Sequence, residues 1–171
     1  MILDDNMNTF IKPFVPLNRI EFLLNKYSPE ELLKSNRGAW SILQHLYHCW
    51  MVERGVLGYV KLKTQDISLL ETVSFTTLFK FFFFFGVLRL KLLKIKAPTV
   101  VQTFPEGISV MDLLDKWGKT REEAAVFFDA LPKEVSSKGI FKHAFIGRLN
   151  LKLTQTFIQW HLQHHLRLCK L

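Results

Sequence analysis

The sequence is poor in cysteine and lacks a long uncharged apolar run. Its two cysteines, Cys49 and Cys169, are not in a paired spacing such as CxxC. We interpret both as small core residues, without a disulfide framework, as fits a reducing compartment. The most hydrophobic region, Leu78 to Leu93, is interrupted by three basic side chains. It falls short of the roughly 18 uncharged residues that a membrane-spanning helix needs, so we expect a soluble protein with no membrane span.

Several functional motifs are also missing. The sequence contains no Gly-rich phosphate loop and no GxSxG, and nothing in it indicates a serine or cysteine triad. The first ten residues hold two aspartates and no basic segment, which is not the pattern of a secretory signal and predicts a cytoplasmic location. Basic residues outnumber acidic ones by 23 to 15. Without a recognised motif, this charge predicts only non-specific attraction to nucleic acid.

Helix signals dominate what is present. The composition, 49% hydrophobic and 22% charged, is that of a globular protein, and the length of 171 residues predicts one domain over residues 1–171. Ser41-Ile42-Leu43-Gln44 matches a capping box, and Asp66 and Ser109 are plausible helix caps. The predicted helices are two short ones starting near Pro16 and Ser28, and long ones over about 41–63, 66–93, 109–131 and 150–171.

The connections and the Phe-rich run complete the predicted fold. Phe81 to Phe85 has no amphipathic period and could be a buried strand by composition, but the length of the apolar segment favours a helix, which Gly86 would kink or break. Residues 134–147 are expected to form a loop, and 94–107 an extended connection over the mouth of a site. Leu168 is expected to pack inward. The expected fold class is all-α, a four-helix bundle with short extra helices in the connections.

Half of the six histidines lie in the last predicted helix. His161 and His165 are one helical turn apart, so both imidazoles can reach one metal ion. This spacing alone is a weak signal, because Leu162 stands where a metalloprotease motif has Glu. The first long helix offers a third ligand, since His45 and His48 are both candidates. We favour His48 with His161 and His165, as three neutral imidazoles around one divalent ion.

Three protein ligands leave an open position for water or substrate, which is the pattern of a catalytic ion. We predict zinc or nickel as the ion, with iron or manganese as alternatives. His45, His143 and His164 are interpreted as polar or partly buried side chains with no ligand role. Glu53, one turn and a little more beyond His48, is either a residue that supports the ligands or, as is commoner, one half of a surface ion pair with a lysine.

Three segments of the chain resemble one family. Residues 38–48, GAWSILQHLYH, followed by Glu53, resemble the "G-x-W-S…H…E" opening of the second helix in the DinB-like (YfiT-like) superfamily. Residues 142–150, KHAFIGRLN, are similar to its "HPxxGxLN" approach to the last helix, and residues 160–165, WHLQHH, to its "WHxxHH" end. Together these segments indicate that the resemblance extends over most of the chain, from about residue 16 to residue 169.

The resemblance implies a four-helix bundle, often a homodimer, with a three-histidine metal site. Carried over by position, the ligands are His48, which follows Trp40 by eight residues, and the pair His161 and His165, so His45 is left out. Two departures stand out. Ala144 replaces a frequent proline, and the run Phe81 to Phe85 is rich in aromatics, which indicates a dimer surface or an apolar pocket.

The resemblance also implies a range of activities. Relatives with assigned activity are hydrolases or thiol S-transferases that use bacillithiol, mycothiol or glutathione. The implied partners are therefore a small-molecule substrate and, for a transferase, a low-molecular-weight thiol. The ion would activate that thiol or a water. The alternative is a stress-response bundle protein that binds a metal or ligand without turnover.

Overall fold

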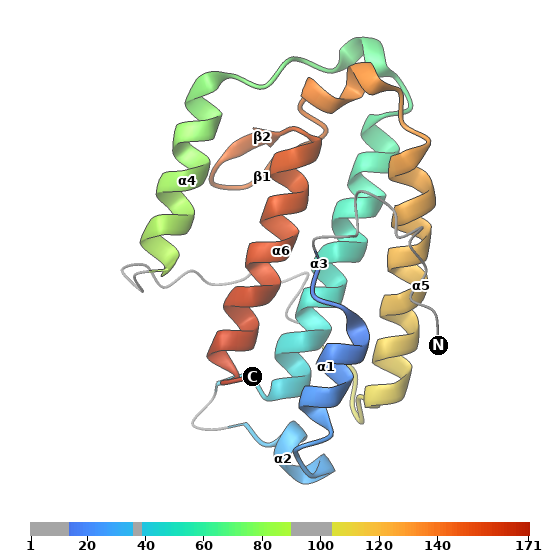
Figure 1. Ribbon diagram of the computed structural model, residues 1–171, viewed down its shortest axis with the longest axis vertical. Helices are drawn as coiled ribbons and strands as arrows, with labels where there is room; N and C mark the ends of the chain where they lie inside the picture. Colours follow the sequence, from blue (N-terminus) through green and yellow to red (C-terminus); the bar gives the residue numbers. More distant parts are fainter. Residues whose placement is uncertain (1–13, 36–38, 90–103) are drawn as a thin grey trace.

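The computed structural model describes residues 14–35, 39–89 and 104–171, and these form a mostly helical molecule (Figure 1). The α-helices in these ranges are α1 (Leu17–Leu24), α2 (Pro29–Leu33), α3 (Ile42–Lys63), α4 (Phe75–Arg89), α5 (Val110–Asp129) and α6 (Leu151–Leu168). Two 3-10 helices, η1 (Ile67–Leu69) and η3 (Lys133–Ser137), and a two-stranded sheet of β1 (Phe141–His143) and β2 (Gly147–Leu149) fill the connections.

Most of the predicted helix starts are confirmed by their caps. The Ser41 backbone N–H donates to Gln44 Oε1 at 2.9 Å, and the Gln44 N–H donates to Ser41 Oγ at 3.2 Å, which together form the predicted capping box of α3. Ser109 caps α5 by accepting from the Asp112 backbone N–H. Asn150 caps α6 in the same way, by accepting from the Leu153 backbone N–H. The starts of α3, α5 and α6 are therefore fixed by local side-chain caps.

Helix α3 lies at the centre of the molecule. It packs against α6 on one side and α5 on the other, while α4 lies beside the β1–β2 hairpin and α6 (Figure 1). The core consists of two apolar clusters, and polar side chains occupy the points on α3 and α6 where one cluster gives way to the other. Glu53 lies between Trp50 and Val56 of the two clusters, and His161 lies between Ile158 and Leu162.

The predicted long helix starting at Asp66 is wrong. Asp66 Oδ1 accepts from the Ser68 backbone N–H at 3.0 Å and from its hydroxyl at 2.6 Å, which closes only the short η1. The chain then runs alongside residues 137–139, since the Gly139 N–H donates to the Glu71 carbonyl at 2.8 Å. This pairing takes up backbone groups that a helix would need, so α4 begins only at Phe75.

The predicted loop over residues 134–147 needs correction, and the expected all-α class is confirmed only as a mostly helical fold. Residues 133–137 form η3, and β1 and β2 pair as an antiparallel hairpin with Phe141 opposite Leu149. Gly147 makes the return possible with φ of +100°, a backbone conformation that favours glycine. Strands of three residues are too short to leave an alternating pattern in the sequence.

The smaller predictions about helices have mixed outcomes, and some cannot be compared. The Phe-rich run is helical, as expected, and α4 continues through Gly86 without a break. The expected inward packing of Leu168 is wrong, because this side chain is 49% exposed while Leu162 and Leu166 are buried instead. The predicted loop at 36–38, the end of the predicted helix near Leu93 and most of the 94–107 connection lie outside the described residues. None of the described helices is long and apolar enough to cross a membrane.

Candidate metal centre

Three histidines from two helices meet at the contact between α3 and α6. His48 comes from α3, and His161 and His165 from successive turns of α6. One ligand atom of each lies within 4.8 Å of the others, and the Nε2 atoms of His48 and His161 are 3.1 Å apart. This is the set predicted from the sequence. The structure brings its three members together, while their binding of an ion remains a prediction.

The separation of these nitrogens suits a shared ion. Two imidazole nitrogens at about 2.0–2.1 Å from a tetrahedral zinc are about 3.3 Å apart. The observed 3.1 Å between His48 and His161 is close to this value. The ring centroids of His161 and His165 are 4.6 Å apart, and those of His48 and His165 are 4.8 Å apart, so the third imidazole borders both others. The donor set therefore fits a divalent ion that accepts nitrogen ligands.

Burial keeps the imidazoles of His161 and His165 in the form that binds metal. Burial, reinforced by repulsion from His48, holds the pKa of His161 well below its usual range. Burial is also the main cause of the lowered pKa of His165, with repulsion from His161 second. A neutral imidazole has a lone pair for a cation, whereas a protonated one does not. His161 and His165 are thus neutral at physiological pH.

The other three histidines surround the cluster at different distances. His45 is half-buried on α3, and its Nδ1 lies 2.8 Å from Nδ1 of His165. His164 packs edge-on against His165, with ring centroids 5.4 Å apart. His143 lies on β1, accepts from the Phe145 backbone N–H through Nδ1 and contacts the Phe157 ring. All three are partly buried, as predicted, but the direct contact of His45 with a candidate ligand was missed.

An aromatic side chain covers the cluster on one side. Trp40 directly precedes the capping box of α3. Its ring is stacked on that of His165, with centroids 6.3 Å apart, and its centroid lies 5.0 Å from that of the His48 ring. Phe104 packs in a T-shaped arrangement with Trp40, with ring centroids 5.1 Å apart. In the family resemblance, Trp40 served only to locate His48, eight residues further along the chain. The structure shows that it forms a wall of the site.

Glu53 supports the scaffold of the site through a buried ion pair, so the expected surface pair with a lysine is wrong. Its Oε1 accepts from Arg121 Nη2 at 2.9 Å and its Oε2 from Arg121 Nε at 3.0 Å. Trp117 Nε1 donates to Oε2 at 2.8 Å. Both charged side chains are less than 10% exposed. Arg121, which no pattern in the sequence indicated, joins α5 to α3 a little more than one turn from His48.

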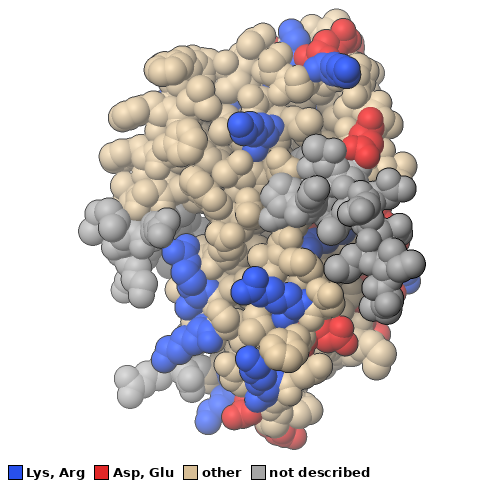
Figure 2. Space-filling view, viewed as in Figure 1, with Lys and Arg blue, Asp and Glu red and all other residues tan. Residues whose placement is uncertain are grey.

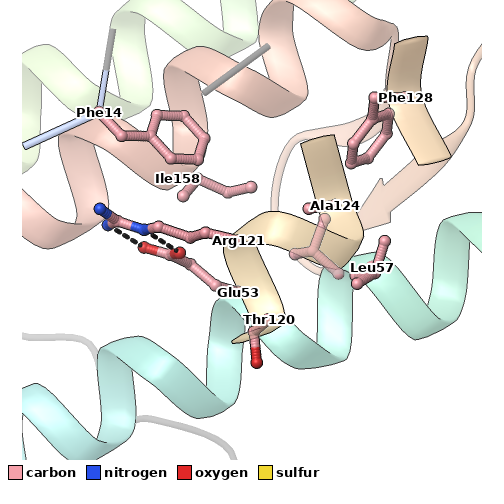
Figure 3. Close-up of a pocket in the computed structure, with 9 residues that line it drawn as sticks. Phe14, Glu53, Leu57, Thr120, Arg121, Ala124, Phe128 and Ile158 are labelled. Atoms are coloured by element: carbon pink, nitrogen blue, oxygen red, sulfur yellow. Dashed lines mark hydrogen bonds and ion pairs between the residues drawn. The ribbon is translucent and has the colours of Figure 1, made fainter. Parts of the chain in front are cut away.

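A small cavity lies beside this ion pair (Figure 3). It is lined by Glu53 and Arg121 together with apolar side chains such as Phe14 and Phe128. Its volume of about 10 Å³ is at the lower limit for a single water molecule. The cavity is therefore too small for a substrate.

The two cysteines are not nucleophiles in this environment. Cys49 is buried, as predicted, and Cys169 is half-buried rather than a core residue. Burial, followed by the charge of Glu53, raises the pKa of the Cys49 thiol well above its usual range. Burial raises the pKa of Cys169 to about 12. Because the thiolate is the reactive form, neither side chain supplies a nucleophile near neutral pH.

Comparison with known proteins identifies the family. The model of the DinB superfamily matches residues 17–169, which is most of the chain. Searches of curated proteins and of solved structures found no match. The chain therefore belongs to the DinB superfamily, and its mostly helical fold with a three-histidine cluster is compatible with metal binding.

Proposed function

We propose that the protein is a metal-dependent enzyme in which His48, His161 and His165 hold one divalent ion. The observation that carries this proposal is the convergence of three imidazoles within 4.8 Å of one another. Membership of the DinB superfamily supports it. Zinc or nickel fits the all-nitrogen donor set, with iron or manganese as alternatives. An ion bound there would supply a Lewis acid that activates water or a low-molecular-weight thiol as a nucleophile.

The surrounding residues have their own roles in this proposal. Half-buried His161 and buried His165 offer lone pairs without first losing a proton, because their pKa values are lowered. Trp40 covers the histidines on one side and so limits the access of water and the directions from which a substrate can approach. Since the pKa values of both cysteines are raised, a thiol that takes part in the reaction must come from a small molecule such as glutathione, bacillithiol or mycothiol.

The test begins with metal content, measured by mass spectrometry on protein purified without an affinity tag. We expect about one ion per chain, lost in His48→Ala, His161→Ala and His165→Ala variants that remain folded by circular dichroism. The replacement His143→Ala, outside the three-histidine set, is the matched control and retains the ion. A native protein that cannot be loaded with zinc, nickel, iron or manganese contradicts the proposal.

Turnover distinguishes the enzyme from its alternative. Loaded protein is screened with p-nitrophenyl esters, and with each thiol together with a chlorodinitrobenzene electrophile. Activity that disappears with a chelator and returns with the ion supports a hydrolase or a thiol S-transferase. One bound ion without turnover in either screen favours the alternative, a stress-response bundle protein that binds a metal or ligand.

We further propose that residues 1–171 form one domain in which α3, α4, α5 and α6 are the four-helix bundle of the family. The packing of α3 between α5 and α6 supports this arrangement. A cytoplasmic location is supported by two cysteines that are both free. Limited proteolysis of the full chain tests the single domain, because one domain yields a resistant core that contains all four helices.

We also propose a homodimer formed through α4. The side chains of Phe75, Phe79, Phe82 and Phe83 recur on one face of this helix and are between 57% and 82% exposed. Figure 2 shows that the surface over α4 is almost free of charged side chains. At about 200 Å² for a whole Phe, these rings expose about 550 Å² per chain, and two such faces exceed the roughly 1,000 Å² of a specific interface.

Light scattering at known protein concentration tests the dimer. The native chain is expected to have twice the monomer mass, and Phe79→Ser with Phe83→Ser to have the monomer mass, because both rings lie on the proposed interface. Phe22→Ser on α1 is the matched control, since Phe22 is 63% exposed and Phe83 is 64% exposed. A native monomer, or a dimer unaffected by the α4 variants, contradicts the proposal.

A further inference from the structure

The contact between His45 and His165 joins a candidate ligand to a histidine outside the ligand set. The two Nδ1 atoms are 2.8 Å apart, which is within hydrogen-bond distance, and the rings are tilted by 47°. His45 lies on α3 three residues before His48, so both project from the same side of that helix. One face of α3 therefore carries a candidate ligand and a side chain that contacts another candidate ligand.

This contact restricts how His165 can bind an ion. A neutral imidazole has one N–H donor and one lone-pair nitrogen. Because Nδ1 of His165 is occupied by His45, Nε2 is the atom that remains for an ion. For Nε2 to carry the lone pair, the proton must be on Nδ1 and be donated to His45, whose own proton is then on Nε2.

We propose that His45 is a positioning residue that accepts a hydrogen bond from His165 Nδ1 and so holds His165 with Nε2 directed to the metal. A carboxylate or a backbone carbonyl commonly has this role beside a metal-binding histidine. Here an imidazole takes its place. The inference rests on the proposed metal site and adds a residue outside the three-histidine set.

Two observations favour a positioning role over a fourth ligand. The described residues whose ligand atoms lie together within 4.8 Å are His48, His161 and His165, without His45. In addition, Trp40 packs against both partners of the contact, edge-on to His45 at 5.3 Å and stacked on His165 at 6.3 Å. The tryptophan thereby limits rotation of both rings and preserves the Nδ1 to Nδ1 contact.

Metal affinity tests the inference on the full chain. Competition with a zinc chelator is expected to show a loss of about 10–100-fold for His45→Phe, which keeps a ring but removes the acceptor. His45→Asn places an amide oxygen near the position of Nδ1 and is expected to restore affinity to within about threefold. The control His164→Phe alters another half-buried histidine that packs on His165 and is expected to bind as the native chain does.

The absorption spectrum of the cobalt-loaded protein gives a second readout. The spectrum of His45→Phe is expected to differ from that of the native chain, and that of His45→Asn to match it, because only the former lets His165 turn. Native affinity and spectrum in His45→Phe would overturn the inference. Failure of the native chain to bind any of zinc, nickel, iron, manganese or cobalt would instead refute the proposed metal site, so the two failures are distinct.

The tautomer of His165 can be measured without any substitution or metal. Nitrogen-15 NMR of the histidine-labelled, metal-free chain distinguishes protonation at Nδ1 from protonation at Nε2. We expect His165 to carry its proton on Nδ1 and His45 on Nε2. A proton on Nε2 of His165 would contradict the proposed role of His45 even if the variants fail to fold.

Discussion

The Nε2 atoms of His48 and His161 lie 3.1 Å apart, although 113 residues separate them in the chain. One is on α3 and the other on α6, so the distance between them depends on how these two helices pack. The site is therefore a property of the folded core, and the groups that fix α3 and α6 determine its geometry.

Lowering the pH is expected to destabilise the metal-free protein. Burial lowers the pKa of His45 and of His143 to about 4, and the pKa values of His161 and His165 are lowered too. Below about pH 6.5 the unfolded chain binds protons that the folded chain does not, so the free energy of unfolding falls by about 1.4 kcal/mol per pH unit for each such group. This fall continues down to the folded pKa of each group.

Urea unfolding between about pH 7.5 and about pH 4.5 measures this effect. His143→Gln is expected to make the dependence shallower by about one proton, because it removes one group with a lowered pKa. Equal stability of the native chain at both ends of this range would show that the histidines do not titrate as their burial requires.

Removing one partner of the buried ion pair is expected to destabilise the fold strongly. Glu53→Ala leaves the Arg121 guanidinium uncompensated in the core, at a cost of about 3–5 kcal/mol. The double variant Glu53→Leu with Arg121→Met is expected to regain most of this loss, since it removes both charges. Lys119→Ala, in an exposed pair with Asp115, serves as the control with a cost of no more than about 1 kcal/mol in urea unfolding.

Adjacent phenylalanines of α4 are expected to differ in their contribution to stability. Phe81 is fully buried and packs on Trp160 with ring centroids 5.7 Å apart, so Phe81→Ala is expected to cost about 3–5 kcal/mol. Phe82 is 57% exposed, and Phe82→Ala is expected to change the stability of the monomer by no more than about 0.5 kcal/mol. Thermal unfolding of dilute protein compares the two, and a reversed order would show that α4 is turned about its axis.

The two thiols are expected to react slowly in the folded protein. Because the pKa values of Cys49 and Cys169 are raised, labelling by a disulfide reagent near pH 8 should be at least about tenfold slower than in denaturant. Cys49→Ala and Cys169→Ala assign the remaining rate to one residue. Fast labelling of the native chain would mean that a thiolate is available and would reopen a role for a cysteine in the chemistry.

The local signals of the sequence predicted much of the helical fold. The capping box at Ser41 and the cap at Asn150 depend on side chains within three residues of each other, so their starts could be recognised without knowing the fold. Asp66 has the same kind of signal but begins a 3-10 turn, because residues 71–73 pair with residues 137–139 instead of continuing a helix. Such pairing between distant segments leaves no local pattern.

The difference between local signals and long-range contacts also explains which residues of the candidate site could be predicted from the sequence. The one-turn spacing of His161 and His165 is local, and the family resemblance pointed to His48 as their partner. In contrast, Arg121 meets Glu53 across 68 residues, and Arg121 is one of many basic side chains in the sequence. The spacing of His45 and His48 places both on one side of α3, and this was the available signal that His45 lies near the cluster.

The separation of the candidate ligands in the chain has a consequence for folding. An ion held by His48 and His161 would close a loop of more than 100 residues, because 113 positions separate the two. In a chain-entropy model, a permanent cross-link over about 100 residues removes roughly 4–5 kcal/mol of freedom from the unfolded ensemble. Metal ligation would therefore join α3 and α6 by a reversible cross-link. Loss of the ion would speed unfolding as well as end any chemistry at the site.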